Sequence, residues 1–476
     1  MRRQYLRATL ATTASAALVG GLLLATGSGA AAAPAGTPGD FNGDGYRDLV
    51  ISAPQGMVDR RAGAGYVTVV NGTRNGLDKS KRTVISQATP GVPGAPEKWD
   101  LFGDRLTTGD LDGDGYTDLV VGVPSERIGY SFSYGAVTVV WGGPNGLRSA
   151  VELQASPHRT EFGLDVAVGD FDGDGRADLA TLNQSVPGVS VFKGPVSRSG
   201  ESAGVTVVES SVTAERIVAG NVNGDGATDL LAMGRQTSGT AHPIRGVLYT
   251  GSGSGLKVSG GVAGGRDAVI ADVDKDGYGD LVTGNPMEKT ADEPNGGLGG
   301  AVTVTYGSAT GLSTRTPVRI TQDTTGVPGA ATKGDRFGWS LSAGDTNGDG
   351  YPDVAVGATG EATGSRKATG AVTVLHGSAR GLTGTGAKTF TQDTAGVPGT
   401  GETFDQFGAA VELIDGDGDR RAELVTGAFA ENDGAGSVWL LASGRGGITA
   451  TGATSFGAHS VGGTSGLAYF GEVLAG

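Results

Sequence analysis

The chain has 476 residues, no cysteine and a formal net charge of −14, which excludes disulfides and makes nucleic acid a poor partner for its acidic surface. Its 89 glycines follow no Gly-X-Y period, which excludes collagen. Glycine between short runs of Val, Thr and Leu favours many strands joined by tight turns.

The first 33 residues predict an export signal and not a part of the fold. A basic start (MRRQYLR) precedes a short apolar run (AALVGGLLLA) and a small-residue stretch (GSGAAAAPA), the order found in secretory leaders. A membrane anchor is the alternative, but the run is too short for a bilayer of about 30 Å. Arg2-Arg3 resembles the twin-arginine motif, with general secretion left open. Residues 34–476 are expected to form one secreted domain without a membrane span. Loss of Arg2, Arg3 and Arg7 takes the charge from −14 to −17.

An acidic motif recurs seven times in this domain. Its copies start at Asp40, Asp110, Asp170, Asn221, Asp272, Asp345 and Asp415. Each copy leads into an apolar run such as DLVVGVP, a second run such as GAVTVVWG, a third such as VELQA and a Phe-Gly segment such as EFGLDV. Alternating, β-branched runs with Asn-Gly or Thr-Gly turns indicate strands. Four strands in each repeat of about 60 residues predict an all-β, seven-bladed β-propeller of four-stranded antiparallel blades.

The two ends of the repeat array predict closure of the ring. No Phe-Gly strand precedes the first motif, whereas the chain finishes with SFGAHSVGGTSGLAYFGEVLAG and no further acidic motif. The C-terminal segment is therefore expected to supply the strand that the first blade lacks, which leaves no free sheet edge.

The motif predicts a calcium site in each blade. Asp or Asn stands at positions 1, 3 and 5, Asp or Glu at position 9, and usually Gly at position 6. Such hard oxygen donors suit Ca²⁺, to which position 7 would add its carbonyl, better than Mg²⁺, which keeps its waters. The predicted ligands are Asp40, Asn42, Asp44, Tyr46 and Asp48; Asp110, Asp112, Asp114, Tyr116 and Asp118; Asp170, Asp172, Asp174, Arg176 and Asp178; Asn221, Asn223, Asp225, Ala227 and Asp229; Asp272, Asp274, Asp276, Tyr278 and Asp280; Asp345, Asn347, Asp349, Tyr351 and Asp353; Asp415, Asp417, Asp419, Arg421 and Glu423.

Two other interpretations of the motif fit less well. An EF-hand or dockerin loop needs Glu at position 12 and a helix after it, but position 12 is Ile, Val, Thr or Ala in every copy. A bare Asp-Gly turn does not explain why the seven motifs hold 24 of the 50 acids. Close like charges cost about 1 kcal/mol per pair, and a turn alone gives nothing to offset that cost. Seven Ca²⁺ would take the mature charge from −17 to −3. The weakest binding is expected at Asn221–Asp229, with two carboxylates, and at Asp415–Glu423, where Arg420 replaces glycine.

These features resemble the FG-GAP repeats of the integrin α-subunit N-terminal propeller family. The resemblance rests on Phe-Gly pairs at 102–103, 162–163, 337–338, 407–408 and 470–471, on SAP at 52–54, on GVP at 122–124 and on the acidic motifs. It implies a seven-bladed propeller with Ca²⁺ in hairpin loops on one face and ligand contact on the other. The repeats before Asn221 and Asp272 lack a clear Phe-Gly strand, and no inserted adhesion domain is visible.

The face opposite the acidic motifs is the predicted contact surface. In an antiparallel blade the loops after the second and fourth strands share one face, and here they are long, at 54–65, 87–101, 124–135, 286–299, 322–336, 358–369 and 392–406. Trp99, Tyr130, Phe132 and Tyr134 are candidate anchors, with packing between blades as the alternative. The expected partner of this cell-adhesion type of module is an extracellular protein or glycan, and the expected state is a monomer.

One string looks catalytic. GESAG at 200–204 matches the G-x-S-x-G elbow, but the elbow needs a strand before Ser202 and a helix after it, whereas PVSRSG precedes and VTVVE follows. We interpret it as a hairpin turn and a chance match, and predict no catalytic residue. The histidines at 158, 242, 376 and 459 show no zinc spacing. A secreted hydrolase or lyase with its site near the central channel, and a structural cell-surface or matrix component, remain alternatives to the binding module.

Overall fold

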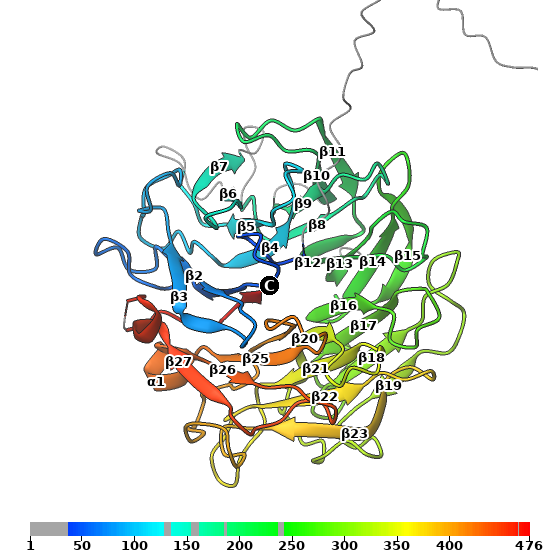
Figure 1. Cartoon of the computed structure of the whole chain (residues 1–476). Coiled ribbons are helices and arrows are strands. Elements are labelled where there is room, and N and C mark those ends of the chain that lie inside the picture. The colour runs from blue at the N-terminus through cyan, green and yellow to red at the C-terminus, as the bar shows by residue number, and fades with distance from the viewer. Residues whose placement is uncertain (1–36, 128–134, 154–160, 185–187, 237–241, 465) are drawn as a thin grey trace, which may run out of the picture.

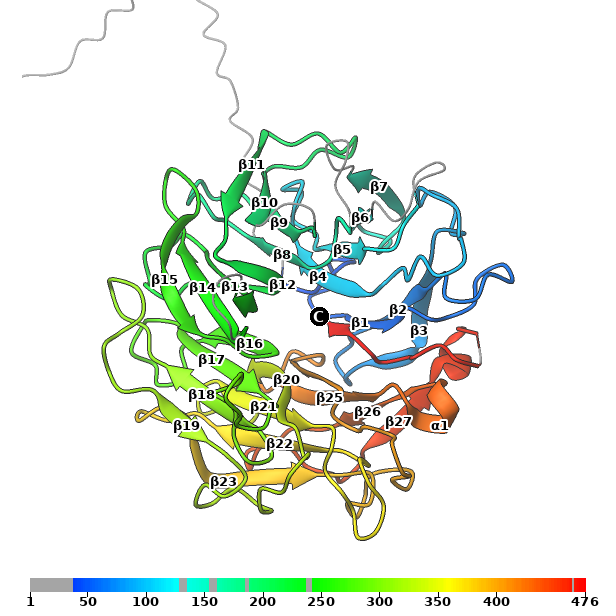
Figure 2. The same ribbon diagram turned by 180° about the vertical axis from the view of Figure 1, so that it is seen from behind.

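Seven four-stranded antiparallel sheets surround a common axis in the computed structural model (Figure 1), and Figure 2 shows the same ring from behind. The structure describes residues 37–127, 135–153, 161–184, 188–236, 242–464 and 466–476. The predicted fold class and the number of blades are confirmed. The predicted export signal, Tyr130, Phe132, Tyr134 and His158 lie outside the described residues. In the described ranges no helix is long and apolar enough to cross a membrane.

Each blade runs from an inner strand beside the axis to an outer strand at the rim. The inner strands are β28 (Leu474–Ala475), β4 (Arg105–Gly109), β8 (Val166–Gly169), β12 (Val212–Gly220), β16 (Asp267–Ala271), β20 (Phe337–Gly344) and β24 (Ala410–Ile414). The second strands are β1 (Leu49–Ala53), β5 (Asp118–Val123), β9 (Asp178–Leu182), β13 (Asp229–Gln236), β17 (Asp280–Asn285), β21 (Asp353–Ala358) and β25 (Glu423–Ala428). The third strands are β2 (Tyr66–Asn71), β6 (Ala136–Trp141), β10 (Gly188–Lys193), β14 (Ile244–Thr250), β18 (Ala301–Thr305), β22 (Ala371–His376) and β26 (Ser437–Leu441). The outer strands are β3 (Asp78–Ile85), β7 (Ser149–Leu153), β11 (Gly204–Glu209), β15 (Lys257–Ala263), β19 (Val318–Ile320), β23 (Thr383–Phe390) and β27 (Thr454–Gly457). Two single helical turns, α1 (Glu431–Gly434) and η1 (Ala458–Val461), lie in the last repeat.

The last strand of the chain closes the ring. β28 pairs antiparallel with β1, and Figure 1 shows the C-terminus at the centre of the ring. The Gly471 N–H donates to the Ser52 carbonyl (2.9 Å) and the Ser52 N–H donates to the Val473 carbonyl (3.0 Å). Arg47 Nη2 donates to the Gly476 carbonyl (2.8 Å). The predicted pairing of the two ends is therefore confirmed.

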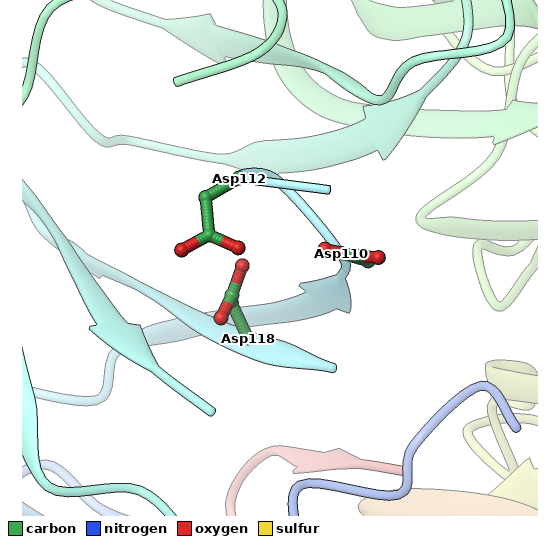
Figure 3. Close-up of side chains that lie close together, drawn as sticks. All are labelled: Asp110, Asp112 and Asp118. Carbon is green, nitrogen blue, oxygen red and sulfur yellow. The ribbon is translucent and has the colours of Figure 1, made fainter. Parts of the chain in front are cut away.

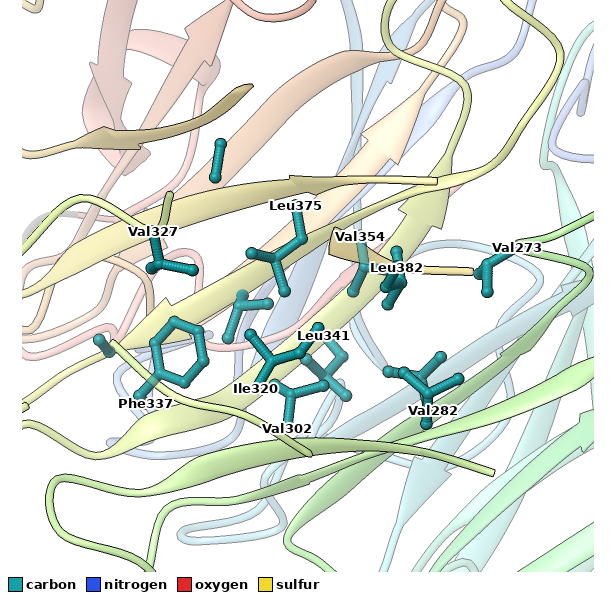
Figure 4. Close-up of a cluster of buried hydrophobic side chains, with 14 of the residues drawn as sticks. Val273, Val282, Val302, Ile320, Val327, Phe337, Leu341, Val354, Leu375 and Leu382 are labelled. Carbon is teal, nitrogen blue, oxygen red and sulfur yellow. The ribbon is translucent and has the colours of Figure 1, made fainter. Parts of the chain in front are cut away.

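The middle strands of the blades are covered on both faces. β5 is buried along its whole length, and Thr68 and Thr138, which alternate with valines in the sequence, are 0 % and 2 % exposed. A period of two normally indicates one wet face, but here each blade packs against a neighbour on either side. The cluster around Val282, Val354 and Leu375, between the fifth and sixth blades, shows this packing (Figure 4).

The Phe-Gly pairs set the spacing between blades. The five rings are fully buried, but the pairs lie in turns just before the inner strand and not within it, except that Phe337 begins β20. The glycine of the pair allows the backbones of two blades to come close together. For example, a Cβ on Gly122 would lie 2.4 Å from the Gly163 carbonyl oxygen of the next blade. β12 and β16 form inner strands without a Phe-Gly pair.

Candidate metal centres

The seven acidic motifs form loops between the inner and second strands, all on one face of the ring. In the second copy the loop joins β4 to β5, and position 9, Asp118, is the first residue of β5. Because every copy enters its second strand at the same motif position or one residue later, the blade geometry places all seven loops alike.

The side chain at position 1 of each motif, a carboxylate in every copy except Asn221, organises its loop. Asp110 Oδ1 accepts hydrogen bonds from the N–H groups of Gly113 (2.8 Å) and Asp114 (3.1 Å), and Oδ2 accepts one from Gly115 (2.9 Å). Asp114 Oδ1 accepts one from the Tyr116 N–H (3.0 Å). The first copy repeats this pattern around Asp40. The backbone therefore wraps around the acidic side chains and keeps them on the inside of the turn.

Position 9 ties the loop to the end of the third strand. Asp118 accepts hydrogen bonds from the N–H groups of Leu111 (2.8 Å) and Gly142 (2.8 Å). The side chain is fully buried, and burial raises the pKa of Asp118 to about 7, with the Asp112 and Asp110 charges adding to the rise. Burial also raises the pKa values of Asp48, Asp280 and Glu423 to about 7. A bound cation would remove this electrostatic penalty.

Carboxylate oxygens converge in four of the motifs. One oxygen from each member of a group lies within 4.8 Å of the others in these sets: Asp110, Asp112 and Asp118; Asp170, Asp172 and Asp178; Asp272, Asp274 and Asp276; Asp415, Asp417 and Glu423. Figure 3 shows the Asp112 and Asp118 carboxylates turned toward each other, with Asp110 beside them. The other three copies, which carry Asn at position 3, form no such three-acid group among the described residues.

The structure does not bring every predicted ligand into these groups. Position 5 takes part only in the fifth copy, as Asp276, although Asp114 and Asp276 both accept the position 7 N–H of their own loop (3.0 Å each). The role of the position 7 carbonyls stays a prediction. Five of the seven side chains at position 7 have a second role, because they cover the glycine at position 4 of the preceding loop.

These contacts link five of the seven pairs of neighbouring loops, whereas Gly113 has no such neighbour and Lys275 replaces the glycine in the fifth loop. The Tyr116 ring would lie 2.6 Å from a Cβ on Gly43, and the Thr117 N–H donates to the Asp40 carbonyl (3.1 Å). The same contact joins Tyr46 to Gly418, Ala227 to Gly173, Tyr278 to Gly224 and Arg421 to Gly348. A cation that orders one loop would therefore also support its neighbour. The recurrent position 4 glycine was the sequence signal for this stacking.

The seventh loop closes in spite of Arg420. This residue has a φ of 71°, which glycine adopts more easily, but its N–H still donates to Asp415 Oδ2 (2.9 Å). At position 9 the longer Glu423 accepts a hydrogen bond from Ser443 Oγ (2.9 Å), where other blades use a glycine N–H. The weak calcium binding expected at the seventh loop stays a prediction, although the carboxylates of this loop do converge.

Basic side chains from the connections between the third and fourth strands face the loops. Arg198, from the β10–β11 hairpin of the third blade, reaches Asp112 and Asp114 of the second blade, each at 2.7 Å. Arg315 Nη1 lies 2.9 Å from Asp274 Oδ2, but Asp274 Oδ1 is buried without a hydrogen-bond partner. An unpartnered carboxylate oxygen inside an oxygen-rich loop fits a hard divalent cation.

Ser202 and the remaining histidines form no catalytic group among the described residues. Ser202 lies in the β10–β11 hairpin, as predicted, and its hydroxyl donates to the Gly204 carbonyl (3.2 Å). His376 Nδ1 lies 3.1 Å from Asp353 Oδ1, and the nearby Asp353 carboxylate raises the pKa of His376. His242 Nδ1 lies 2.9 Å from the Gln236 carbonyl.

A central cavity of about 510 Å³ opens between the starts of the inner strands, on the face opposite the acidic loops. Charged side chains dominate its lining: Asp104, Arg105, Glu215, Arg216, Arg235, Arg266, Asp267, Glu412 and Glu472. Arg266 stacks on Trp339, with Cζ 3.7 Å from the ring centroid. Sequence reasoning missed this site because its residues come from several blades and share no local motif.

The cavity acids predict a pH dependence of stability. Burial raises the pKa of Glu472 from 4.5 to about 7, so between these values the folded chain holds a proton that the unfolded chain releases. The free energy of unfolding therefore falls as the pH rises through this window. Between pH 5 and pH 8 the melting temperature of Glu472→Gln, measured by calorimetry, is expected to fall less than that of the wild type. The exposed Glu201→Gln is the control, and an equal loss in Glu472→Gln and wild type would contradict the assignment.

Comparison with known proteins is consistent with this architecture. A family model described as FG-GAP repeat matches residues 32–70, 264–305 and 337–375, and one described as FG-GAP-like repeat matches residues 110–181. Phosphatidylinositol-glycan-specific phospholipase D of Mus musculus is 32 % identical over 168 residues, which cover 34 % of this chain and 19 % of that protein. Integrin alpha-IIb of Homo sapiens is 28 % identical over 327 residues, which cover 66 % of this chain and 25 % of that protein. The chain thus spans a quarter or less of the length of these relatives.

Among solved structures, the periplasmic gluconolactonase of Pseudomonas aeruginosa matches with a TM-score of 0.44 and 14 % sequence identity. The match covers 86 % of this chain and 95 % of that one. We draw no functional conclusion from a similarity this distant.

Proposed function

For this chain of FG-GAP repeats, similar in sequence to integrin α subunits, we propose the role of an exported, calcium-stabilised binding module. Its partner, a protein or a glycan, contacts the face opposite the acidic loops. Export rests on the leader-like residues 1–33. The module works as a monomer.

Calcium is the cation that the loops suit best. Their donors are carboxylate and amide oxygens only, at alternate positions of a tight turn, which matches the irregular, oxygen-rich coordination of Ca²⁺. Residues at positions 1, 3, 5 and 9 would hold the ion, which supplies positive charge beside the buried acid. The ion would thereby connect the inner, second and third strands of a blade.

The positions of the exposed apolar side chains are the main support for the proposed contact face. Nine large apolar residues are exposed in the described part of the chain. Six lie in loops after second or fourth strands: Met57, Trp99, Met287, Leu298, Phe404 and Leu467. The other three, Val205, Val207 and Val258, lie on outer strands. Apolar residues gathered on one rim indicate an interaction surface.

Two of these residues are held out by a strained backbone. Trp99 and Phe404 occupy equivalent positions in the loops before β4 and β24, are 46 % and 61 % exposed, and have φ values of 71° and 75°. A bulky residue with positive φ costs on the order of 1–3 kcal/mol and is concentrated at functional sites. Rigid, exposed aromatics on loops make good contact anchors.

Removal of both aromatics should abolish partner binding without unfolding the ring. Each truncation is expected to cost about 2 kcal/mol, or about 30-fold in affinity. The wild type, Trp99→Ala/Phe404→Ala and the control Val205→Ala/Val207→Ala would be tested on a glycan array and against proteins of the culture medium. A partner bound equally well by all three would place the contact elsewhere, and a scaffold function predicts no specific partner.

The central cavity favours a hydrolase or lyase as the second candidate. Glu412 and Glu472 line it, and burial raises both pKa values to about 7, a value suited to general acid–base chemistry near neutral pH. If this candidate is right, the protein turns over glycan or lipid substrates. Glu472→Gln should then abolish that activity, and Ser202→Ala should leave it unchanged.

A further inference from the structure

A second set of buried polar groups lies at three junctions between blades, on the face opposite the acidic motifs. Each set, here called a junction triad, combines a Gln after an outer strand, an Asp before the next inner strand and a Glu after the next second strand. The triads are Gln87, Asp100 and Glu126; Gln322, Asp335 and Glu361; Gln392, Asp405 and Glu431. In each triad the Asp follows the Gln by 13 residues and the Glu follows it by 39.

The same contacts recur in all three triads. Gln87 Nε2 donates to Glu126 Oε2 (2.7 Å), and the other two triads repeat this bond at 2.6 and 2.7 Å. The Asp accepts a backbone N–H three residues before it, from Glu97 in the first triad (2.5 Å) and from Thr332 in the second (2.5 Å). Three copies of one arrangement indicate a built site and not an accident of packing.

The Gln and Asp of each triad are buried, as is Glu126, whereas Glu361 and Glu431 are partly buried. Gln87, Asp100 and Glu126 are 6 %, 0 % and 5 % exposed, and Gln392 and Asp405 are 2 % and 3 % exposed. No ion pair within 4.0 Å involves any of the six acids in the described part of the chain. Buried carboxylates are normally paired, protonated or bound to a metal.

Unpartnered oxygens point to a ligand. The Oε1 atoms of Gln87, Gln322 and Gln392 are fully buried and accept no hydrogen bond, and neither does Asp100 Oδ1. A proton shared by the two acids would satisfy the carboxylates but would leave these amide oxygens without a partner. A cation bound between the amide oxygen and the carboxylates would satisfy all of them at once.

We propose that each junction triad binds a divalent cation of the Ca²⁺ class, giving three metal sites in addition to the acidic loops. The donors are an amide oxygen and two carboxylates, hard ligands that suit Ca²⁺, and two carboxylates balance its charge. Asp100 and Asp405 directly follow Trp99 and Phe404, so the ion holds the loops that present these exposed aromatics. The sites do not depend on metal binding by the acidic motifs.

Counting bound ions tests the proposal. After dialysis against micromolar Ca²⁺, elemental analysis should find three fewer ions per chain in Glu126→Gln/Glu361→Gln/Glu431→Gln than in the wild type. The exposed pair Glu201→Gln/Glu209→Gln is the matched control and should lose none. Asp118→Asn removes a ligand of an acidic loop only, so it separates loss at the loops from loss at the triads. An unchanged ion count in the folded triple variant would overturn the proposal.

Terbium luminescence offers a test with a single substitution. Trp439 Nε1 donates to the Pro398 carbonyl (2.8 Å), and a Cβ on Gly399 would lie 3.9 Å from Trp439 and 4.0 Å from Gln392, so the two side chains are close to each other. Tb³⁺ in the third triad should therefore be excited through Trp439, and Glu431→Gln and Trp439→Phe should each remove that signal. A Gln at 431 mimics a protonated Glu. If Glu431→Gln keeps both the signal and the calcium-dependent stability, the site holds a proton and not a metal.

Discussion

Loss of calcium from the acidic loops is expected to lower the melting temperature of the protein by about 12 °C at pH 7.5. Four loops with converging carboxylates, each saturated at 100 times its Kd, would together add about 11 kcal/mol to the free energy of unfolding, at about 2.7 kcal/mol per site. For about 440 folded residues the unfolding entropy is about 0.9 kcal/mol per kelvin, which converts this energy into the expected shift. The physical reason is the buried acid at position 9, such as Asp118, whose pKa burial raises and whose charge the ion would balance.

The measurement is a calorimetric melt in EGTA and again after calcium is restored. On chelation the melting temperature of Asp118→Asn/Asp178→Asn/Asp280→Asn should fall by about 9 °C less than that of the wild type, since three of the four loops are altered. An amide at position 9 is a weaker ligand and carries no buried charge. Magnesium at the same concentration should restore less than calcium does. A wild-type midpoint that does not move on chelation would refute the metal assignment of the loops.

Deletion of residues 467–476 is expected to prevent folding of the ring. The deletion removes Phe470, whose ring is fully buried and whose loss alone costs about 3–5 kcal/mol. It also removes the backbone bonds to Ser52 and the partly buried Val473 and Leu474, about 1–2 kcal/mol each. The total of about 10 kcal/mol matches the whole stability of a typical domain, about 5–15 kcal/mol.

Light scattering after size-exclusion chromatography should show aggregates of the truncated chain, because β1 becomes a free sheet edge. A synthetic peptide of residues 464–476, added during refolding, should restore the monomer by taking the place of β28. The same peptide with Phe470→Ala is the control and should restore little. A truncated chain that stays monomeric and melts like the wild type would show that closure through β28 contributes nothing.

Much of this architecture followed from local patterns in the sequence. Seven motif copies in phase with short β-branched runs predicted the blade number and the position of each acidic loop. The unmatched ends, at Asp40 and Phe470, predicted the closing strand. The junction triads also left a signal that went unused, namely the spacings of 13 and 39 residues from each Gln to its acids.

The sequence by itself determined which segments are strands and which loops carry acids, because turn geometry and strand preference depend on residues close together in the chain. Only the tertiary structure decided what those segments meet. Thr68 is buried because a neighbouring blade covers it, and Arg198 faces Asp112 across a blade boundary. Arg266 and Glu472 share a cavity although 206 positions separate them. Contacts of this kind depend on how the ring closes. A local sequence pattern does not indicate which residues that closure brings together.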